Sequence, residues 1–119
     1  MHYFIFDKKG HAVAYIQKQV IFSIKGKALS FIRGENVFSY RGKQIGTFDK
    51  GWVRDLKGNC VFYGKEHSGV GPITPIPQIP PIPYIAEIPP VPPIPEIPHI
   101  RAIPSFSLSS FTTEEFFNK

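Results

Sequence analysis

The chain has 119 residues, enough for one domain, and a single cysteine, Cys60, which excludes an internal disulfide framework. The net charge is +5, with an excess of basic side chains in residues 1–71 and a slight acidic excess in residues 72–119. The first residues lack the basic and apolar pattern of a secretion signal, and prolines interrupt the longer apolar runs. We therefore expect a soluble, cytoplasmic protein with no membrane span.

Glycine and proline divide the chain into two parts. All ten glycines lie at or before Gly71, and all thirteen prolines lie at or after Pro72. This change in composition predicts a body over residues 1–71, an isoleucine-proline tract over residues 72–104 and a C-terminal capping segment over residues 105–119. A body of about 70 residues is small for an independent core, so we expect the tract to pack on it or to associate with other copies.

The body is built from a sixteen-residue repeat. Aligned on their glycines, four blocks read IFDKKGHAVAYI, IFSIKGKALSFI, VFSYRGKQIGTF and VRDLKGNCVFYG. A fixed period indicates one supersecondary unit built several times. Apolar residues alternate with period two on both sides of each glycine, which predicts one β-hairpin per block. The aligned glycines are Gly10, Gly26, Gly42 and Gly58.

Each of these glycines follows an Asp or Ser three residues earlier. The side-chain oxygen of such a residue accepts a hydrogen bond from the backbone two residues on, and glycine supplies the positive φ that ends the turn. The combination predicts a type I turn followed by a glycine bulge, a common hairpin connection. We therefore interpret the four side chains as turn formers and not as catalytic or metal-binding groups: Asp7, Ser23, Ser39 and Asp55.

The four hairpins are predicted to form an all-β fold about a pseudo-four-fold axis. The first strand of each hairpin is apolar on nearly every position, which requires burial on both faces. Small residues after the glycines indicate close approach of backbones near a shared axis. Radial closure would also leave few exposed strand edges. The small residues are Ala12, Ala14, Ala28, Ser30 and Gly46.

Several features follow one another in an order that is more specific than any one of them. They are the repeated hydrophobic-[DS]-x-x-G blocks, the GWVRDLKGNCVFY unit, the SGVGP junction, the P-I-x tract and the SxSLSSxxxEEFF ending. In this order they resemble the bacterial four-fold beta-flower family over essentially the whole chain. The resemblance implies a pseudo-four-fold arrangement of β-hairpins. The family is of undefined function, so no catalytic or binding residue carries over from it.

The isoleucine-proline tract places an aliphatic residue at every third position from Ile73 to Ile103. A polyproline II helix has three residues per turn, so these side chains form one apolar stripe, which we expect to be buried. Straight, the tract would span on the order of 95 Å, so it must bend back, coil around the body or associate with other copies. The candidate contact residues of the stripe are Ile76, Ile79, Ile82, Ile85, Ile88, Val91, Ile94 and Ile97.

Two other interpretations of the tract remain open. A rigid spacer explains the prolines but has no need for isoleucine at every third position. A ligand for SH3 or WW domains would use PxxP spacings such as Pro72 to Pro75, but the usual basic flank is absent from Gln78 to His99.

The end of the chain is expected to form a short helix. Thr112 followed by Glu115 is a capping-box pattern with acidic residues in the first turn. Phe111, Phe116 and Phe117 would dock this helix over an open edge of the β-body. A recognition motif is the alternative.

No pattern typical of an enzyme or of a metal site stands out. Cys60 and His67 suggest a thiol nucleophile with its base, but Cys60 occupies a repeat position held by alanine in the first two blocks, which indicates a packing position. We expect no catalytic residue, no metal site and no cofactor. The scattered histidines, without metal-ligand spacing, are His2, His11, His67 and His99.

Basic residues cluster at the glycine turns, and the pseudo-axis would arrange them in a ring, which we call the basic rim. Solvated turn tips explain lysines there without any function. The alternative is a surface for nucleic acid, a phospholipid or an acidic protein, although only Tyr40 is close enough to support base stacking. The basic rim consists of Lys8, Lys9, Lys25, Lys27, Arg41, Lys43 and Lys57.

The sequence therefore favours a non-enzymatic structural or protein-interaction module. Its apolar stripe would pack internally, drive self-association or bind a protein partner. Binding of nucleic acid or another polyanion through the basic rim is the second hypothesis.

Overall fold

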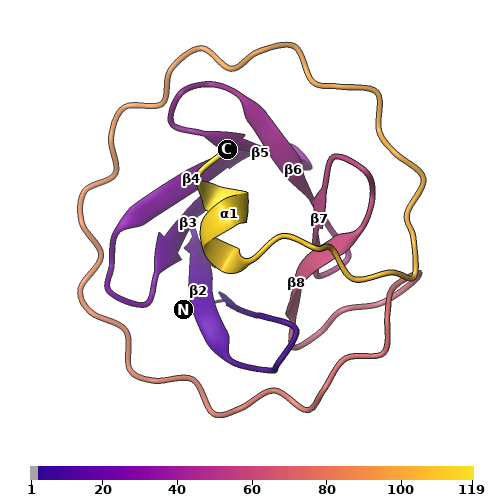
Figure 1. Cartoon of the computed structure of the whole chain (residues 1–119). Coiled ribbons are helices and arrows are strands. Elements are labelled where there is room, and N and C mark those ends of the chain that lie inside the picture. The colour runs from indigo at the N-terminus through magenta and orange to yellow at the C-terminus, as the bar shows by residue number, and fades with distance from the viewer. Residues whose placement is uncertain (1–2) are drawn as a thin grey trace.

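A computed structural model describes residues 3–119 and shows a closed barrel of eight antiparallel strands in sequence order (Figure 1). Each sixteen-residue block forms one hairpin, which confirms the predicted all-β fold with four hairpins about a pseudo-four-fold axis. β1 pairs with β8, so the barrel closes. The strands are β1 (Tyr3–Phe6), β2 (Ala12–Gln17), β3 (Val20–Ser23), β4 (Ala28–Arg33), β5 (Asn36–Ser39), β6 (Gln44–Asp49), β7 (Trp52–Asp55) and β8 (Cys60–Gly64).

The glycine turns have the predicted geometry. In the first turn, the N–H of Gly10 donates to the carbonyl oxygen of Asp7 at 2.9 Å, and Asp7 Oδ1 accepts from the N–H of Lys9 at 3.0 Å. Gly10 has a φ of 85°, and the N–H of Asp7 donates to the carbonyl oxygen of His11 at 2.9 Å, which makes Gly10 the bulge residue of the turn. A separate register shift lies further along the hairpin, between Ile5 and Phe6. The same shift recurs in the other three hairpins. The Asp and Ser side chains of the turns are therefore structural.

Both faces of the barrel wall are buried, as the two-sided apolar strands require. The residues five positions before the turn glycines point into the interior of the barrel and are fully buried: Ile5, Ile21, Val37 and Val53. On the outer face, rings of adjacent strands stack in three pairs with centroids 5.4 to 5.7 Å apart: Tyr15 with Phe22, Phe31 with Phe38, and Phe6 with Tyr63. At the fourth equivalent position Thr47 pairs with Arg54 instead.

Three of the five predicted small residues face the barrel axis. Ala12 and Ala28 instead pack on the outer face beside Phe6 and Phe22, because the register shift in each hairpin turns them outward, so the prediction was wrong for these two. Ala14, Ser30 and Gly46 occupy equivalent positions of the repeat and are buried, whereas the fourth position holds Phe62. The space that they leave is filled from the C-terminus, since a Cβ at Gly46 would lie 3.0 Å from the ring of Phe116. A side chain at position 46 would overlap the backbone carbonyl oxygen of Arg54 on the neighbouring strand and would also press on the ring of Phe116.

Helix α1 (Thr113–Phe117) covers one end of the barrel (Figure 1). The predicted capping box between Thr112 and Glu115 is present, and Phe116 is fully buried. The ring of Phe117 stacks on that of Phe62, with centroids 5.4 Å apart. The expected open sheet edge does not exist, because the strands close on themselves. The helix instead caps the end of a closed barrel.

Residues 72–104, which we call the belt, run once around the outside of the barrel without helix or strand (Figure 1). The molecule is a disc with Cα extents of 36 × 36 × 22 Å. A circle of that diameter measures about 113 Å, and the belt covers about 100 Å at roughly 3.1 Å per residue. The tract therefore has the length of one circuit. Coiling around the body is the arrangement observed among the three that the sequence left open.

The prediction that the apolar stripe is buried was wrong for the isolated chain. The stripe residues are 87–99 % exposed, whereas prolines at the next position of the three-residue period, such as Pro77, Pro80 and Pro83, are half-buried. A rod with three residues per turn presents only one of its three sides to the barrel. Hydrogen bonds from its backbone fix the rotation of the rod, and that rotation turns the isoleucines outward.

Candidate functional site

The belt has a nine-residue repeat of its own, which we did not predict from the sequence. Its successive units read PIPQIPPIP, YIAEIPPVP and PIPEIPHIR, each with Gln or Glu at the fourth position. Nine residues are three turns of polyproline II, so the same side of the rod returns to each hairpin turn. The N–H groups of Gln78, Glu87, Glu96 and Ser105 donate to the carbonyl oxygens of Gly10, Gly26, Gly42 and Gly58 at 2.9, 2.8, 2.8 and 3.2 Å, respectively.

Two of these residues also bind the barrel through their side chains. Glu87 Oε2 accepts from the N–H of Ala28 at 2.6 Å, and Glu96 Oε1 accepts from the N–H of Gln44 at 2.8 Å. The hydrogen bond from Gln44, supported by the nearby His99, lowers the pKa of the Glu96 carboxyl below its usual value. Each glutamate therefore holds the belt to a hairpin with both its backbone and its carboxylate.

The turn glycines allow the belt to approach the barrel closely. A Cβ at Gly42 would lie 3.0 Å from the carbonyl oxygen of Ile94, and a Cβ at Gly26 would overlap the carbonyl oxygen of Ile85. The glycines thus have two functions, because they adopt a positive φ and also leave room for the belt.

Arg54 joins the two ends of the belt. Its guanidinium is buried and donates to the carbonyl oxygens of Gly58 and Ser105 at 2.7 and 2.9 Å, and also to that of Val70. Val70 precedes the belt and Ser105 follows it, so one side chain closes the circuit. A planar group with five N–H donors suits three converging carbonyls. Three hairpins carry a pair of stacked rings on the outer face, whereas the fourth equivalent position holds Thr47 and Arg54. Arg54 is needed there to hold the two ends of the belt together.

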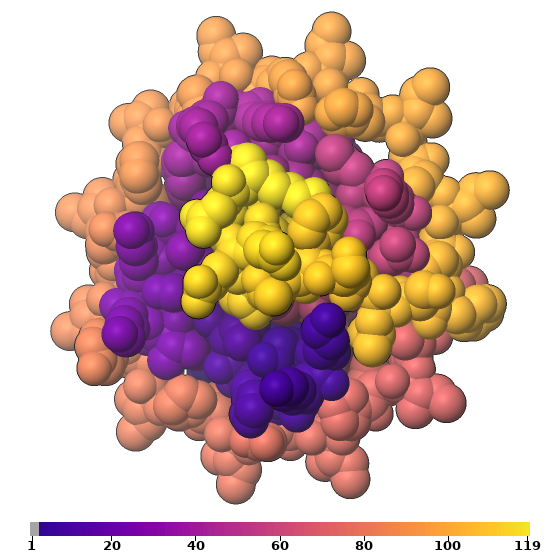
Figure 2. All heavy atoms as spheres, viewed as in Figure 1, coloured from indigo at the N-terminus to yellow at the C-terminus, as the bar shows by residue number. Residues whose placement is uncertain are grey.

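The outer side of the belt is apolar around the disc, and Figure 2 shows its side chains projecting along the outline of the molecule. Phe106, which is 71 % exposed, continues the three-residue period beyond the belt. All eight candidate contact residues are on this outer side. The complete apolar stripe consists of Ile73, Ile76, Ile79, Ile82, Ile85, Ile88, Val91, Ile94, Ile97, Ile100 and Ile103.

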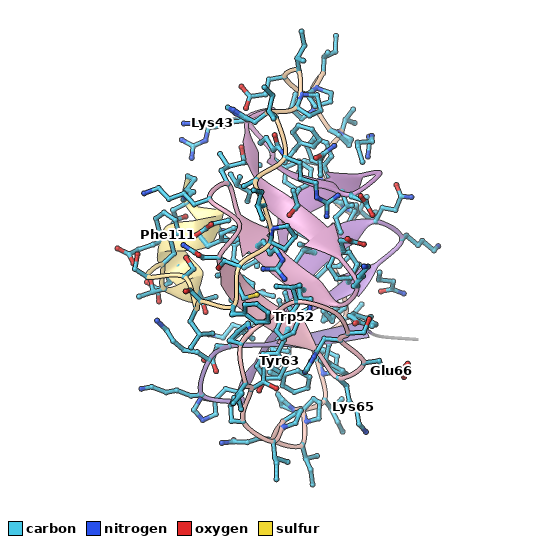
Figure 3. All side chains as sticks on the ribbon, turned by 90° about the vertical axis from the view of Figure 1, so that its right-hand side faces the viewer. Lys43, Trp52, Tyr63, Lys65, Glu66 and Phe111 are labelled. Atoms are coloured by element: carbon cyan, nitrogen blue, oxygen red, sulfur yellow. The ribbon has the colours of Figure 1, made fainter. Side chains whose placement is uncertain are left out.

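The seven residues of the basic rim are all exposed and lie at the end of the barrel that α1 covers. Figure 3 shows Lys43 and Phe111 on this side of the disc, with Lys65 and Glu66 on the opposite side. Two members contact the C-terminal segment, since Lys8 donates to the carbonyl oxygen of Ser109 at 3.4 Å and Arg41 donates to that of Lys119 at 2.6 Å.

Acidic groups beside the basic rim reduce its positive potential. Glu87 and Glu96 bind next to the second and third turns, and Glu114 and Glu115 lie in the first turn of α1. The positive charge at this end is therefore partly neutralised by the belt and the helix.

The chain matches the family model described as 4-fold beta flower protein over residues 3–117. The chain belongs to this family. The match spans the barrel, the belt and the C-terminal helix, so all three are parts of the beta flower. No curated protein and no solved structure matches the chain.

Cys60 occupies a packing position in the beta flower. Its thiol is buried, and burial raises the pKa of this thiol to about 11, so it is protonated at neutral pH. The ring of His67 contacts Trp52, and its Nε2 lies 3.1 Å from the hydroxyl of Thr74. His2 lies outside the described residues. Cys60 begins β8 and His67 lies beyond the other end of the same strand, so the length of the strand separates the two residues.

Residues 3–119 contain no group of three or more His, Cys, Asp or Glu that could hold a metal ion. No helix of this part of the chain is long and apolar enough to cross a membrane.

A hollow of about 660 Å³ separates β1 from the first quarter of the belt. Its walls are mainly aromatic and aliphatic, and Lys65 and Glu66 supply the charged groups. Ile76 and Ile79 line it as well as belonging to the apolar stripe, so the hollow extends the apolar outer surface inward. The other lining residues are Tyr3, Phe4, Phe6, Pro77, Gln78 and Pro80.

Proposed function

We propose that this beta flower is a non-enzymatic protein-interaction module and that the apolar stripe is its binding surface. The observation that carries the proposal is the near-complete exposure of eleven aliphatic side chains, at 87–99 %, on a belt fixed to a closed barrel. Monomeric proteins rarely expose a contiguous apolar patch larger than a few hundred Å² without an interaction function. Burying one such side chain contributes roughly 1.5–3 kcal/mol, so three neighbouring ones supply about 5–9 kcal/mol.

The rigidity of the belt supports the same function. Its prolines fix φ, and its hydrogen bonds to the four glycine turns hold the rod in place. A surface that is ordered before binding loses little conformational entropy when a partner docks. A flexible spacer would have neither property.

The proposal is tested by the size of the complex that the full chain forms in the cells that produce it. The belt variant carries Ile82→Ser, Ile88→Ser and Ile94→Ser, and a matched control replaces the exposed Lys18, Gln19 and Lys50 by Ser. We expect the wild type and the control to elute well above the 13.4 kDa of the monomer, and the belt variant to elute as a monomer. Elution of the wild type as a monomer, or retention of the large complex by the belt variant, would contradict the proposal.

Polyanion binding by the basic rim is the second candidate, supported by the exposure of all seven members at one end of the disc. It predicts salt-dependent retention on DNA or RNA that is lost when Lys25, Lys27 and Lys43 are changed to Glu. Lys8 and Arg41 are left unchanged because they contact the C-terminal segment. Retention that does not change after this charge reversal would count against the rim.

A further inference from the structure

We propose that the partner of the apolar stripe is a protein that encloses the disc, such as a ring or sleeve with an apolar inner wall. This inference rests on the proposed function and specifies the shape of the partner. It states that the partner contacts the whole circumference of the disc.

The stripe surrounds the disc without concentrating on one sector. The belt keeps an aliphatic residue at every third position around its whole length, and the residues Ile76, Ile85, Ile94 and Ile103, nine residues apart, are 90, 97, 95 and 87 % exposed. A partner that docks on one side would need apolar residues on that side alone. The uniform distribution fits a partner that surrounds the whole edge.

The area of the stripe exceeds what a flat or convex partner can cover. At roughly 100 Å² of apolar surface per aliphatic side chain, eleven side chains expose on the order of 1,100 Å². A partner that contacts three neighbours would cover about 300 Å². Two discs touching edge to edge would thus bury about 600 Å² in total, which is typical of crystal-packing contacts and below the roughly 1,600 Å² of a stable interface. Only a concave partner covers the full stripe.

The dimensions and charges of the disc favour a protein over a lipid bilayer as the enclosing partner. The disc is 22 Å thick, whereas the hydrocarbon core of a bilayer is about 30 Å thick. Lys25 and Lys43 are exposed on the face that α1 covers, and Lys18 and Lys50 are exposed on the opposite face. A bilayer that surrounded the belt would have to become thinner by about 8 Å, or these lysines would have to extend their side chains to its interfaces, and either change costs free energy. A protein partner, in contrast, needs an apolar inner surface that is only as high as the single row of side chains in the stripe.

The repeat of the belt also bears on the symmetry of the partner. Stripe residues are three residues apart, which corresponds to about 9.3 Å along a polyproline II rod. The hydrogen bonds to the four turns recur every nine residues, so the outer surface presents similar features at quarter-circle intervals. A cyclic partner with two-fold or four-fold symmetry would make equivalent contacts around the edge.

The test places a photoreactive benzophenone amino acid at one position at a time in the full chain, in the cells that produce it. The four positions are Ile76, Ile85, Ile94 and Ile103, one in each quarter, and Lys18 on the face opposite α1 is the matched control. Enclosure predicts that all four belt positions yield the same cross-linked protein product in similar amounts, and that the control yields none of it.

The alternative outcomes separate the inference from the proposed function. A product from only one or two neighbouring quarters would overturn enclosure but keep the proposed function, since the partner would then dock on one side. Products that contain only further copies of this chain would also overturn enclosure and would identify edge-to-edge self-association. If irradiation gives no cross-linked protein product at any of the four positions, both the enclosure of the disc and the proposed protein-binding function are overturned.

Discussion

A substitution at one glycine turn tests the contact between the belt and the barrel. Gly26 has a φ of 85°, and its carbonyl oxygen accepts the N–H of Glu87 at 2.8 Å. The carbonyl oxygen of Ile85 lies where the Cβ of an alanine would stand. The change Gly26→Ala therefore strains the turn and also pushes the belt away from the second hairpin.

The expected loss has separable contributions. An alanine in the left-handed region costs about 1–2 kcal/mol. Displacement of the belt weakens the hydrogen bond between Glu87 and Gly26, worth about 1 kcal/mol, and the bond between the Glu87 carboxylate and Ala28, worth about another 1 kcal/mol at an exposed site. The free energy of unfolding should therefore fall by about 3–4 kcal/mol.

Gly34→Ala is the matched control. Gly34 also has a positive φ, of 61°, but nothing lies within 4 Å of the Cβ that an alanine would add. Its loss should be about 1–2 kcal/mol, from the backbone conformation alone. Denaturant unfolding of both variants measures the difference, and amide exchange of Glu87 and Tyr84 reports on the belt directly. Equal losses for the two variants, with unchanged exchange at both amides, would refute the contact.

Three further predictions concern the belt clamps and the helix. The pKa of the Glu96 carboxyl is lowered from 4.5 in the folded state, so the carboxylate stabilises the fold above pH 4.5, and this contribution is lost as the pH falls through the folded pKa. Glu96→Gln should therefore make the free energy of unfolding less dependent on pH in this acidic range. An unchanged pH dependence would contradict the contact between Glu96 and the third hairpin. Arg54→Met removes the donor from the carbonyl groups of Val70 and Ser105 and leaves that of Gly58 with only the N–H of Ser105, so unfolding should become about 3–5 kcal/mol easier. The amide of Ser105 should also exchange faster, whereas unchanged exchange would show that Arg54 does not close the belt. Phe116→Ala should cost about 3–5 kcal/mol in denaturant unfolding, and a loss under 1 kcal/mol would mean that the ring does not fill the barrel.

The barrel could be predicted from the sequence because local chemistry determines each of its parts. The Asp or Ser three residues before each glycine specifies the turn, and period-two alternation specifies the strands on either side. The capping box of Thr112 and Glu115 likewise specifies the start of α1. These signals act over a few residues, so they are visible before any tertiary contact is known.

The orientation of the belt could not be predicted from the stripe alone. A period of three places the isoleucines on one side of the rod, but it does not say whether that side faces the barrel or the solvent. The N–H donors Gln78, Glu87 and Glu96 decide the rotation, since a proline has no N–H to donate. Their nine-residue spacing was present in the sequence and would have indicated four equivalent attachment points.

Closure of the belt depends on residues that are far apart in the chain. Arg54 departs from the aromatic residues at the equivalent positions, Phe6, Phe22 and Phe38, and this departure was the only sequence signal for its contact with Val70 and Ser105. The basic rim was predicted as a ring, but its contacts with the C-terminal segment depend on the fold.

The outward orientation of the apolar stripe is tested most directly by the free energy of unfolding of the purified full chain that carries Ile82→Ser, Ile88→Ser and Ile94→Ser. These side chains are 92, 94 and 95 % exposed, so we expect a free energy of unfolding within about 1 kcal/mol of the wild-type value. Buried isoleucines would each cost about 2–5 kcal/mol on such truncation. A loss of more than about 6 kcal/mol, or a chain that no longer folds, would show that the stripe belongs to the core and would contradict the account.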